Sequence, residues 1–183
     1  MNGSIKVFDC HKGNETHSYK IHKGAVTKIM FHPNPMKLIL VSTGDDFAIR
    51  IYDLVVSSCL HSFLLHESNV SALLFTDNGT NLITAGADKR IVIWDFVNMA
   101  FQAQIEYDDE IFAMNFVKII EKSKKKTEER GYLIVAGMSG LLKTIDITSN
   151  DVQIKEFPEH TSHEVLKIMY LKHKNQIVCV TND

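Results

Sequence analysis

The chain has 183 residues, of which 45% are hydrophobic and 23% charged, and its formal net charge is −2. This composition is typical of an ordinary globular protein and excludes a chain that is disordered throughout. The near-zero net charge argues against nucleic-acid binding through the overall field of the fold, although a local basic patch keeps that possibility open. The sequence contains neither a long uncharged apolar run nor a signal-like start, so we expect no membrane span and no secretion.

A repeat of about 40 residues organises the chain, which indicates a repeat architecture. Alternating apolar residues, followed by an aromatic or aliphatic residue and then Asp, occur four times and end at Asp9, Asp53, Asp95 and Asp146. Between these marks the apolar positions alternate or cluster in short runs, and they do not recur at helical spacing. The pattern therefore predicts β-strands throughout.

Three complete units and two partial ones follow in chain order. Residues 1–9 are predicted to end one unit, residues 16–53, 58–95 and 100–146 to form units of four strands, and residues 151–183 to form an incomplete one. Turn residues separate the strands, such as HPNP at 32–35 and TDNGTN at 76–81. Four strands per unit indicate the blades of a β-propeller. We therefore predict an all-β fold of about four four-stranded antiparallel sheets in an incomplete ring.

Polar residues recur at matching positions of two units. The second complete unit has His66, Thr84, Asp88 and Trp94, and the first has His22, Ser42, Asp46 and Tyr52, with six residues from the turn Asp to the aromatic ring in both. An imidazole, a hydroxyl, a carboxylate and an indole N–H can satisfy one another away from water. The pattern predicts a buried network that stabilises each of these blades.

The other units depart from this pattern. The third has Asp109, Ser139 and Ile145 at the corresponding positions, so its network is expected to be missing. In the last unit, His160, Cys179 and Asp183 occupy the matching places, and no aromatic residue follows. We therefore expect a truncated last blade.

These motifs resemble the WD-repeat family, in which a histidine, a Ser or Thr, a turn Asp and Trp-Asp recur in each blade; the glycine that usually precedes the histidine is absent here. The segments 31–60 and 87–95 further resemble the first propeller of the transducin-beta-like-three family. That resemblance implies a tandem-propeller subunit of the UTP-B subcomplex of the small-subunit processome. It implies nucleolar work in pre-ribosomal RNA processing, carried out by holding other proteins.

Two catalytic interpretations were weighed against these structural roles. His22, His66 and His160 are candidate metal ligands or general bases, and Asp46 with Asp88 a candidate acid–base pair, but equivalent positions of different blades lie too far apart to converge on one site. No nucleophile elbow, phosphate loop or metalloprotease helix motif is present. The three cysteines, Cys10, Cys59 and Cys179, include no C-x-x-C pair and predict reduced thiols. We expect no enzyme activity, cofactor or metal.

Two surfaces are candidates for partner contact. By analogy with other propellers, the turn residues Asp45, Phe47, Lys89 and Arg90 are expected to meet partner proteins. The insertion at 118–131 carries further candidates for contact with RNA phosphates or an acidic partner, or forms a solvated mobile loop: Lys122, Lys124, Lys125 and Lys126.

The leading functional hypothesis is a nucleolar scaffold that binds other WD-repeat subunits of a large assembly. A ubiquitin-ligase or signalling adaptor and a hydrolytic propeller are the alternatives. The open ends of the blades also predict self-association, with two chains completing a ring.

Overall fold

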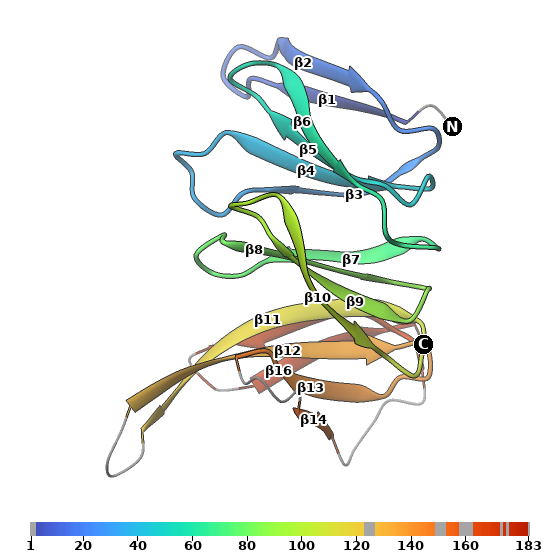
Figure 1. Ribbon diagram of the computed structural model, residues 1–183, viewed down its shortest axis with the longest axis vertical. Coiled ribbons are helices and arrows are strands. Elements are labelled where there is room, and N and C mark those ends of the chain that lie inside the picture. Colours follow the sequence, from blue (N-terminus) through green and yellow to red (C-terminus); the bar gives the residue numbers. More distant parts are fainter. Residues whose placement is uncertain are drawn as a thin grey trace.

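The structure, a computed structural model, describes residues 3–122, 127–148, 153–157, 163–172, 174 and 176–182. Over these residues the regular elements are all β-strands, arranged as a row of sheets from the N-terminal to the C-terminal part of the chain (Figure 1). The described part of the chain has no helix long and apolar enough to cross a membrane. The prediction of an all-β chain of antiparallel sheets in an incomplete ring is confirmed.

Three sheets have four strands each, and we call them the first, second and third blade. The first blade consists of β3 (Val26–Phe31), β4 (Ile39–Gly44), β5 (Ile49–Asp53) and β6 (Ser58–Phe63). The second consists of β7 (Val70–Phe75), β8 (Asn81–Gly86), β9 (Arg90–Asp95) and β10 (Ala100–Glu106). The third consists of β11 (Ile111–Lys122), β12 (Thr127–Gly137), β13 (Leu142–Asp146) and β14 (Gln153–Glu156).

Two-stranded sheets lie before and after these blades. The N-terminal half-sheet pairs β1 (Ser4–Phe8) with β2 (Glu15–Lys20), and the C-terminal half-sheet pairs β15 (Val165–Leu171) with β16 (Gln176–Thr181).

The blades are offset by one strand from the units predicted by the repeat. Residues 16–53, 58–95 and 100–146 were each expected to form one sheet, and residues 1–9 and 151–183 to form partial ones. Instead, the first strand of each complete unit bonds to the last strand of the unit before it, as β6 does with β5. The reason is that strands joined by a short turn pair as a hairpin, so the chain completes β5–β6 before it crosses to the next sheet. Each sequence unit therefore links two neighbouring sheets covalently.

The Asp that ends each repeat caps the turn that follows it. Oδ1 of Asp53 accepts the backbone amide of Val55 at 2.7 Å, and Asp9, Asp95 and Asp146 bond the amide two residues on in the same way. A short carboxylate that bonds the backbone two residues on forms an Asx turn. The recurring Asp that marks the sequence repeat thus has a local role in closing the hairpins.

The first strand of each blade begins with a β-bulge that links it to the next blade. The bulged residue is Thr27 in β3 and Ser71 in β7, where the pairing register shifts. The hydroxyl of Thr27 donates to the carbonyl of Val70 at 3.4 Å, and the hydroxyl of Ser71 donates to that of Ile111. A bulge leaves its extra residue outside the ladder, so these hydroxyls are free to reach the first strand of the neighbouring blade.

The apolar core lies largely between facing sheets. Between the first and second blades, Phe63 stacks on Trp94 at 4.2 Å between ring centroids, and Val41 packs in the same cluster as Leu73 and Phe75. A second cluster joins the second and third blades through residues such as Ile83, Ile105 and Leu133. Each fully buried side chain of this size contributes about 1.5–3 kcal/mol. Contacts between neighbours therefore set the row of sheets.

The insertion of the third blade is a hairpin for most of its length. The segment 118–131 was predicted to be a loop between strands, but β11 and β12 continue through it, with Lys118 opposite Gly131 and Lys122 opposite Thr127. An ion pair of 2.5 Å between Lys118 and Glu129 lies across these two strands. Opposite charges that face each other across strands favour this extension of the ladder.

Candidate interaction rim and its buried polar networks

The second blade contains a continuous chain of four polar side chains. Nε1 of Trp94 lies 2.9 Å from Oγ1 of Thr84. The same hydroxyl lies 2.8 Å from Nε2 of His66, and Nδ1 of that ring lies 2.7 Å from Oδ2 of Asp88. Thr84 is fully buried, and His66 and Trp94 are nearly so. The structure thus brings together the four residues that the repeat pattern singled out in this unit.

The direction of donation in this chain follows from Trp94. An indole N–H can only donate, so the Thr84 hydroxyl accepts from it and gives its own proton to Nε2 of His66. Nδ1 of His66 therefore carries the ring proton and donates it to Asp88. The carboxylate of Asp88 also accepts the backbone amides of Glu67 at 3.1 Å and Arg90 at 3.3 Å. A neutral histidine and an ionised aspartate satisfy these hydrogen bonds.

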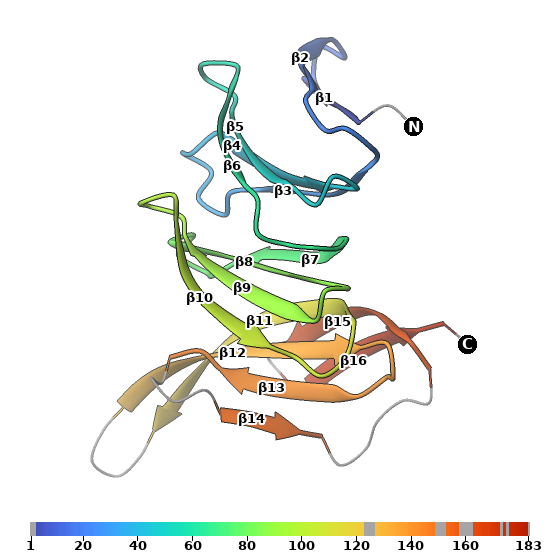
Figure 2. The ribbon, with the colours of Figure 1, turned by 45° about the vertical axis from the view of Figure 1, so that its right-hand side comes forward.

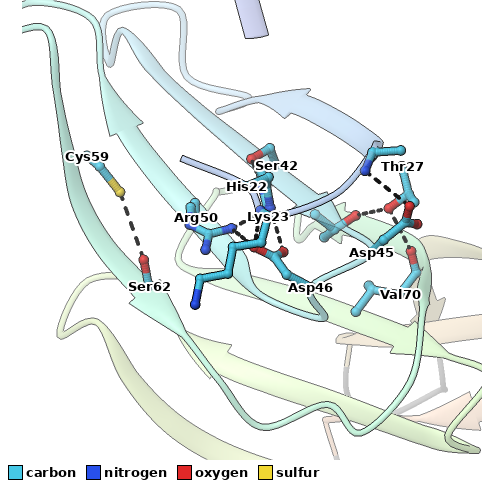
Figure 3. A network of polar contacts seen from close by, with 12 residues as sticks. His22, Lys23, Thr27, Ser42, Asp45, Asp46, Arg50, Cys59, Ser62 and Val70 are labelled. Carbon is cyan, nitrogen blue, oxygen red and sulfur yellow. Dashed lines mark hydrogen bonds and ion pairs between the residues drawn. The ribbon is translucent and has the colours of Figure 1, made fainter. Parts of the chain in front are cut away.

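The first blade has the same chain with two substitutions (Figure 3). Nδ1 of His22 lies 2.7 Å from Oδ1 of Asp46, and its Nε2 lies 2.6 Å from Oγ of Ser42. Ser42 in turn lies 3.4 Å from the hydroxyl of Tyr52, which is fully buried. The four residues predicted for this unit are also brought together.

A buried cation, which the sequence analysis missed, joins the network of the first blade. Nη1 of Arg50 lies 2.8 Å from Oδ2 of Asp46 and also contacts Nδ1 of His22, as Figure 3 shows. Arg50 is opposite Ser42 in the ladder, where the second blade has Val92 opposite Thr84. A charged residue inside the apolar run 49–52 was the available signal, because buried arginines are rare unless they are paired.

Asp46 is the electrostatic centre of this network. Burial alone would raise its pKa, but hydrogen bonds from His22, the amide of Lys23 and Arg50 outweigh burial and lower the pKa to about 2. The carboxylate is therefore ionised at neutral pH and holds a ring, a guanidinium and a loop amide at once.

The third blade replaces the network with a different set of contacts. Asp109 takes the place of the histidine, and its Oδ2 accepts the amide of Ser139 at 2.7 Å, while Ile145 is fully buried in the place of the tryptophan. Lys143, at the ladder position of Arg50, is buried and lies 2.7 Å from Asp108. In the last unit Cys179 lies in β16, and His160 and Asp183 lie outside the described residues.

Both histidine networks predict a loss of stability in mild acid. Burial lowers the pKa of His66 and of His22, and the neighbouring carboxylates oppose it only in part. The unfolded chain, with a histidine pKa of about 6.5, therefore takes up protons first. Stability is fully present above about pH 6.5 and is lost as the pH falls through the folded-state values.

The urea midpoint should therefore fall between about pH 7 and pH 5, and His66→Gln should remove part of this dependence. A midpoint that is constant or rises on acidification over this range would contradict the neutral, buried histidines.

The networks hold the loops at one end of each blade, which we call the rim: residues 21–25, 44–47, 64–69, 86–89, 107–110 and 137–140. The rim lies on the right-hand side of Figure 1. Asp46 accepts the amide of Lys23 at 2.9 Å, so one carboxylate ties the connection before the blade to the turn within it. Asp88 does the same with Glu67.

The four predicted contact residues lie on or beside this rim. Phe47 is exposed, as is Asp45, whose carboxylate accepts the amide of Ala25 at 3.1 Å. In the second blade, Lys89 is exposed and Arg90 pairs with Glu67 at 2.9 Å. Lys122 ends β11 at the opposite end of the third blade, and Lys124, Lys125 and Lys126 lie outside the described residues. The two predicted contact surfaces therefore do not adjoin.

Two of these turns hold a side chain in the left-handed backbone region. The φ angle is 58° at Phe47 and 62° at Lys89, whereas the third blade has Gly140, with φ 78°, at the same place in its turn. A side chain in this region costs about 1 kcal/mol, partly offset by the greater unfolded-state freedom of glycine.

Lys89→Gly should therefore stabilise the chain by about 0.5 kcal/mol, measured by urea unfolding. Lys89→Ala removes the same side-chain contacts without relieving the backbone, and it should not stabilise. Equal effects of the two variants would argue against strain in the turn.

The described residues also bear on the metal and disulfide predictions. They contain no group of three or more His, Cys, Asp or Glu side chains arranged to hold a metal ion. His22 and His66 belong to separate blades, as do Asp46 and Asp88. Cys10, Cys59 and Cys179 are all free thiols.

Known proteins match the N-terminal part of this chain. The family described as WD domain, G-beta repeat, matches residues 13–53 and 57–95. A stretch of 93 residues is 36% identical to transducin beta-like protein 3 of Bos taurus, and 34% identical to the proteins of that name from Rattus norvegicus and Mus musculus. This stretch is 51% of the chain but 12% of each relative's length. The chain is therefore a WD40-repeat protein related to transducin beta-like protein 3.

Proposed function

We propose that this chain is a non-catalytic protein-interaction scaffold that acts as a subunit of the small-subunit processome in pre-ribosomal RNA processing. WD40 domains generally mediate contacts between proteins, and the similarity to transducin beta-like protein 3 supports the choice of this assembly. Its location would then be the nucleolus, and its partners other WD-repeat subunits of the same assembly.

The rim is the surface that carries this proposal. Its loops are fixed from below by buried networks, so its exposed side chains are presented on a rigid support. Phe47 offers an apolar ring, and Asp45, Lys89 and Arg90 offer charges of both signs. Aromatic and arginine side chains are enriched at protein interfaces, and mixed charges suit a protein partner better than a polyanion.

Affinity purification of the tagged 183-residue chain from cells, followed by mass spectrometry, tests this proposal. We expect WD-repeat subunits of the processome to co-purify and a fluorescent fusion to collect in the nucleolus. Phe47→Ala with Arg90→Ala should reduce their recovery about tenfold, the effect of losing about 1.4 kcal/mol of binding energy. Val97→Ala, at an exposed position at the opposite end of the second blade, should leave recovery unchanged.

Other outcomes would favour the remaining hypotheses. Recovery of ubiquitin-ligase or G-protein components in place of processome proteins would replace our proposal with an adaptor role. Activity in a hydrolase screen, together with a bound metal, would favour a catalytic propeller.

Pre-ribosomal RNA is reached through partner proteins in this proposal. Ultraviolet cross-linking to RNA provides the check. A cross-link that disappears when the lysines of the insertion are replaced by alanine would give the chain a direct RNA contact: Lys122, Lys124, Lys125 and Lys126.

A further inference from the structure

The two half-sheets contain different halves of a blade. β1 pairs with β2 as β5 pairs with β6, including a register shift at the equivalent residue. β15 pairs with β16 as β3 pairs with β4, including the bulge near its start. The N-terminal half-sheet therefore corresponds to the third and fourth strands of a blade, and the C-terminal half-sheet to the first and second. Among the described residues, β1 pairs only with β2 and β16 only with β15.

A groove lies beside the free edge of β1. It has a volume of about 290 Å³ and is lined by Ser4, Ile5 and Lys6 of β1 and by residues 26–29 of β3. In the complete blades, the second strand pairs with this edge of the third strand. The groove is thus located where the missing strands of the N-terminal half-sheet would pack.

Apolar residues of β3 are uncovered at this groove and beyond it. Ile29 is 58% exposed and Phe31 is 56% exposed. The equivalent residues of the second blade, Leu73 and Phe75, are 8% and 9% exposed because they pack against the blade before them. The N-terminal half-sheet lacks the two strands that would cover Ile29 and Phe31 in the same way.

The C-terminal half-sheet has a matching apolar face. Met169 lies opposite Val178 and Lys167 opposite Val180, so these side chains share one face of the two-stranded sheet. All three apolar residues of this face are exposed. The other face, with Ile168, packs against the third blade. An open strand edge and an open apolar face therefore occur together at each end of the row.

We propose that the β15–β16 hairpin of a second copy of this chain adds to the free edge of β1. The result is a four-stranded sheet in the order β15-β16-β1-β2, in which Met169 and Val178 cover Ile29 and Phe31. Addition of strands to an exposed edge is an established mode of recognition, and it removes an edge that otherwise promotes aggregation. The two half-sheets of one copy lie at opposite ends of the row in Figures 1 and 2, so the complement comes from another copy.

Reciprocal pairing of two copies closes the assembly. Each copy contributes three blades and two half-sheets, so two copies form six blades of their own and two shared ones, eight in all. Closed propellers have about four to eight blades. The same patch is used by both partners, as a two-fold interface requires. This inference does not depend on the proposed function.

The register of the shared sheet follows from the complete blades. Ser42 of β4 pairs with Arg50 of β5, and Val41 pairs with Ile51. The equivalent pairs across the shared sheet are Cys179 with Lys6 and Val178 with Val7. Opposite residues of antiparallel strands have Cα atoms about 4.5–5.5 Å apart, which is within the range of a disulfide.

A disulfide cross-link tests this register. In a chain with Cys10→Ser and Cys59→Ser, Lys6→Cys should form a disulfide with Cys179 and give a species of twice the 20.8 kDa chain mass after mild oxidation. Val7→Cys places its thiol on the other face of the same strand and should not cross-link to Cys179. A cross-link within a single chain, or its absence, overturns the proposal.

Light scattering of the unmodified 183-residue chain gives a second test. We expect a dimer, and Val178→Lys should weaken its dissociation constant at least tenfold because it places a charge in the covered face. Val97→Lys, at an exposed turn of the second blade, should leave the dimer intact. A monomer at high concentration, or equal effects of the two lysines, contradicts the shared sheet.

Discussion

Replacing Asp46 with alanine should lower the free energy of unfolding by about 3–5 kcal/mol. The carboxylate accepts hydrogen bonds from His22, Arg50 and the amide of Lys23, and Arg50 is only 8% exposed. Its removal leaves a buried guanidinium without its counter-charge, which is more costly than the loss of a neutral hydrogen bond. Urea unfolding at neutral pH gives the measurement.

A double-mutant cycle separates the charge from the rest of the network. Arg50→Val gives the first blade the residue that the second has at Val92, and it should change stability by about 1 kcal/mol or less. When combined with Asp46→Ala, it should reduce the loss to about 1–3 kcal/mol, the loss also expected for Asp88→Ala. Additive effects of the two substitutions would show that Arg50 and Asp46 do not interact in the folded state.

The polar networks could be predicted from the sequence because they depend on spacing alone. A histidine, a hydroxyl, a turn Asp and an aromatic ring recur at equal offsets in two units, and hydrogen-bonding capacity dictates how such groups pair. The third unit, with Asp109 and Ser139, has no such set, and its contacts are different in the structure. Periodicity likewise predicted the strands of the blades.

The boundaries between sheets could not be predicted in this way. A periodic sequence has no natural starting point, so the same strands can be divided into units before or after the hairpin turn that Asp53 caps. Hydrogen bonding decides the division, and it places β6 with β5 rather than with β7. The bulged hydroxyls of Thr27 and Ser71 were missed for a related reason, because their partners lie in the next sheet.

The length of the β11–β12 hairpin was missed because charge was taken as a sign of a loop. The segment 118–131 is rich in Lys and Glu, which are depleted in strands. In a hairpin that extends beyond the core, however, both faces meet water, and charges such as those of Lys118 and Glu129 can pair across the strands. Composition alone does not distinguish these two environments.

Replacing Thr84 with valine should lower the free energy of unfolding by about 2–6 kcal/mol. The two side chains have nearly the same shape, so the substitution removes a hydroxyl without opening a cavity. That hydroxyl is fully buried, accepts from Trp94 at 2.9 Å and donates to His66 at 2.8 Å. Its loss leaves an indole N–H and a ring nitrogen without partners, and each buried unsatisfied group costs about 1–3 kcal/mol.

Thr84→Ser is the matched control, because it keeps the hydroxyl and reproduces the residue that the first blade has at Ser42. It should cost about 1 kcal/mol, the value of the lost methyl group. The fluorescence of Trp94, the single tryptophan of the chain, reports on the same site during unfolding. If valine were as well tolerated as serine, the hydroxyl would not be the link between the indole and the imidazole. The carboxylate of Asp88 would then position the His66 ring alone, and the rim of the second blade would be held from one side.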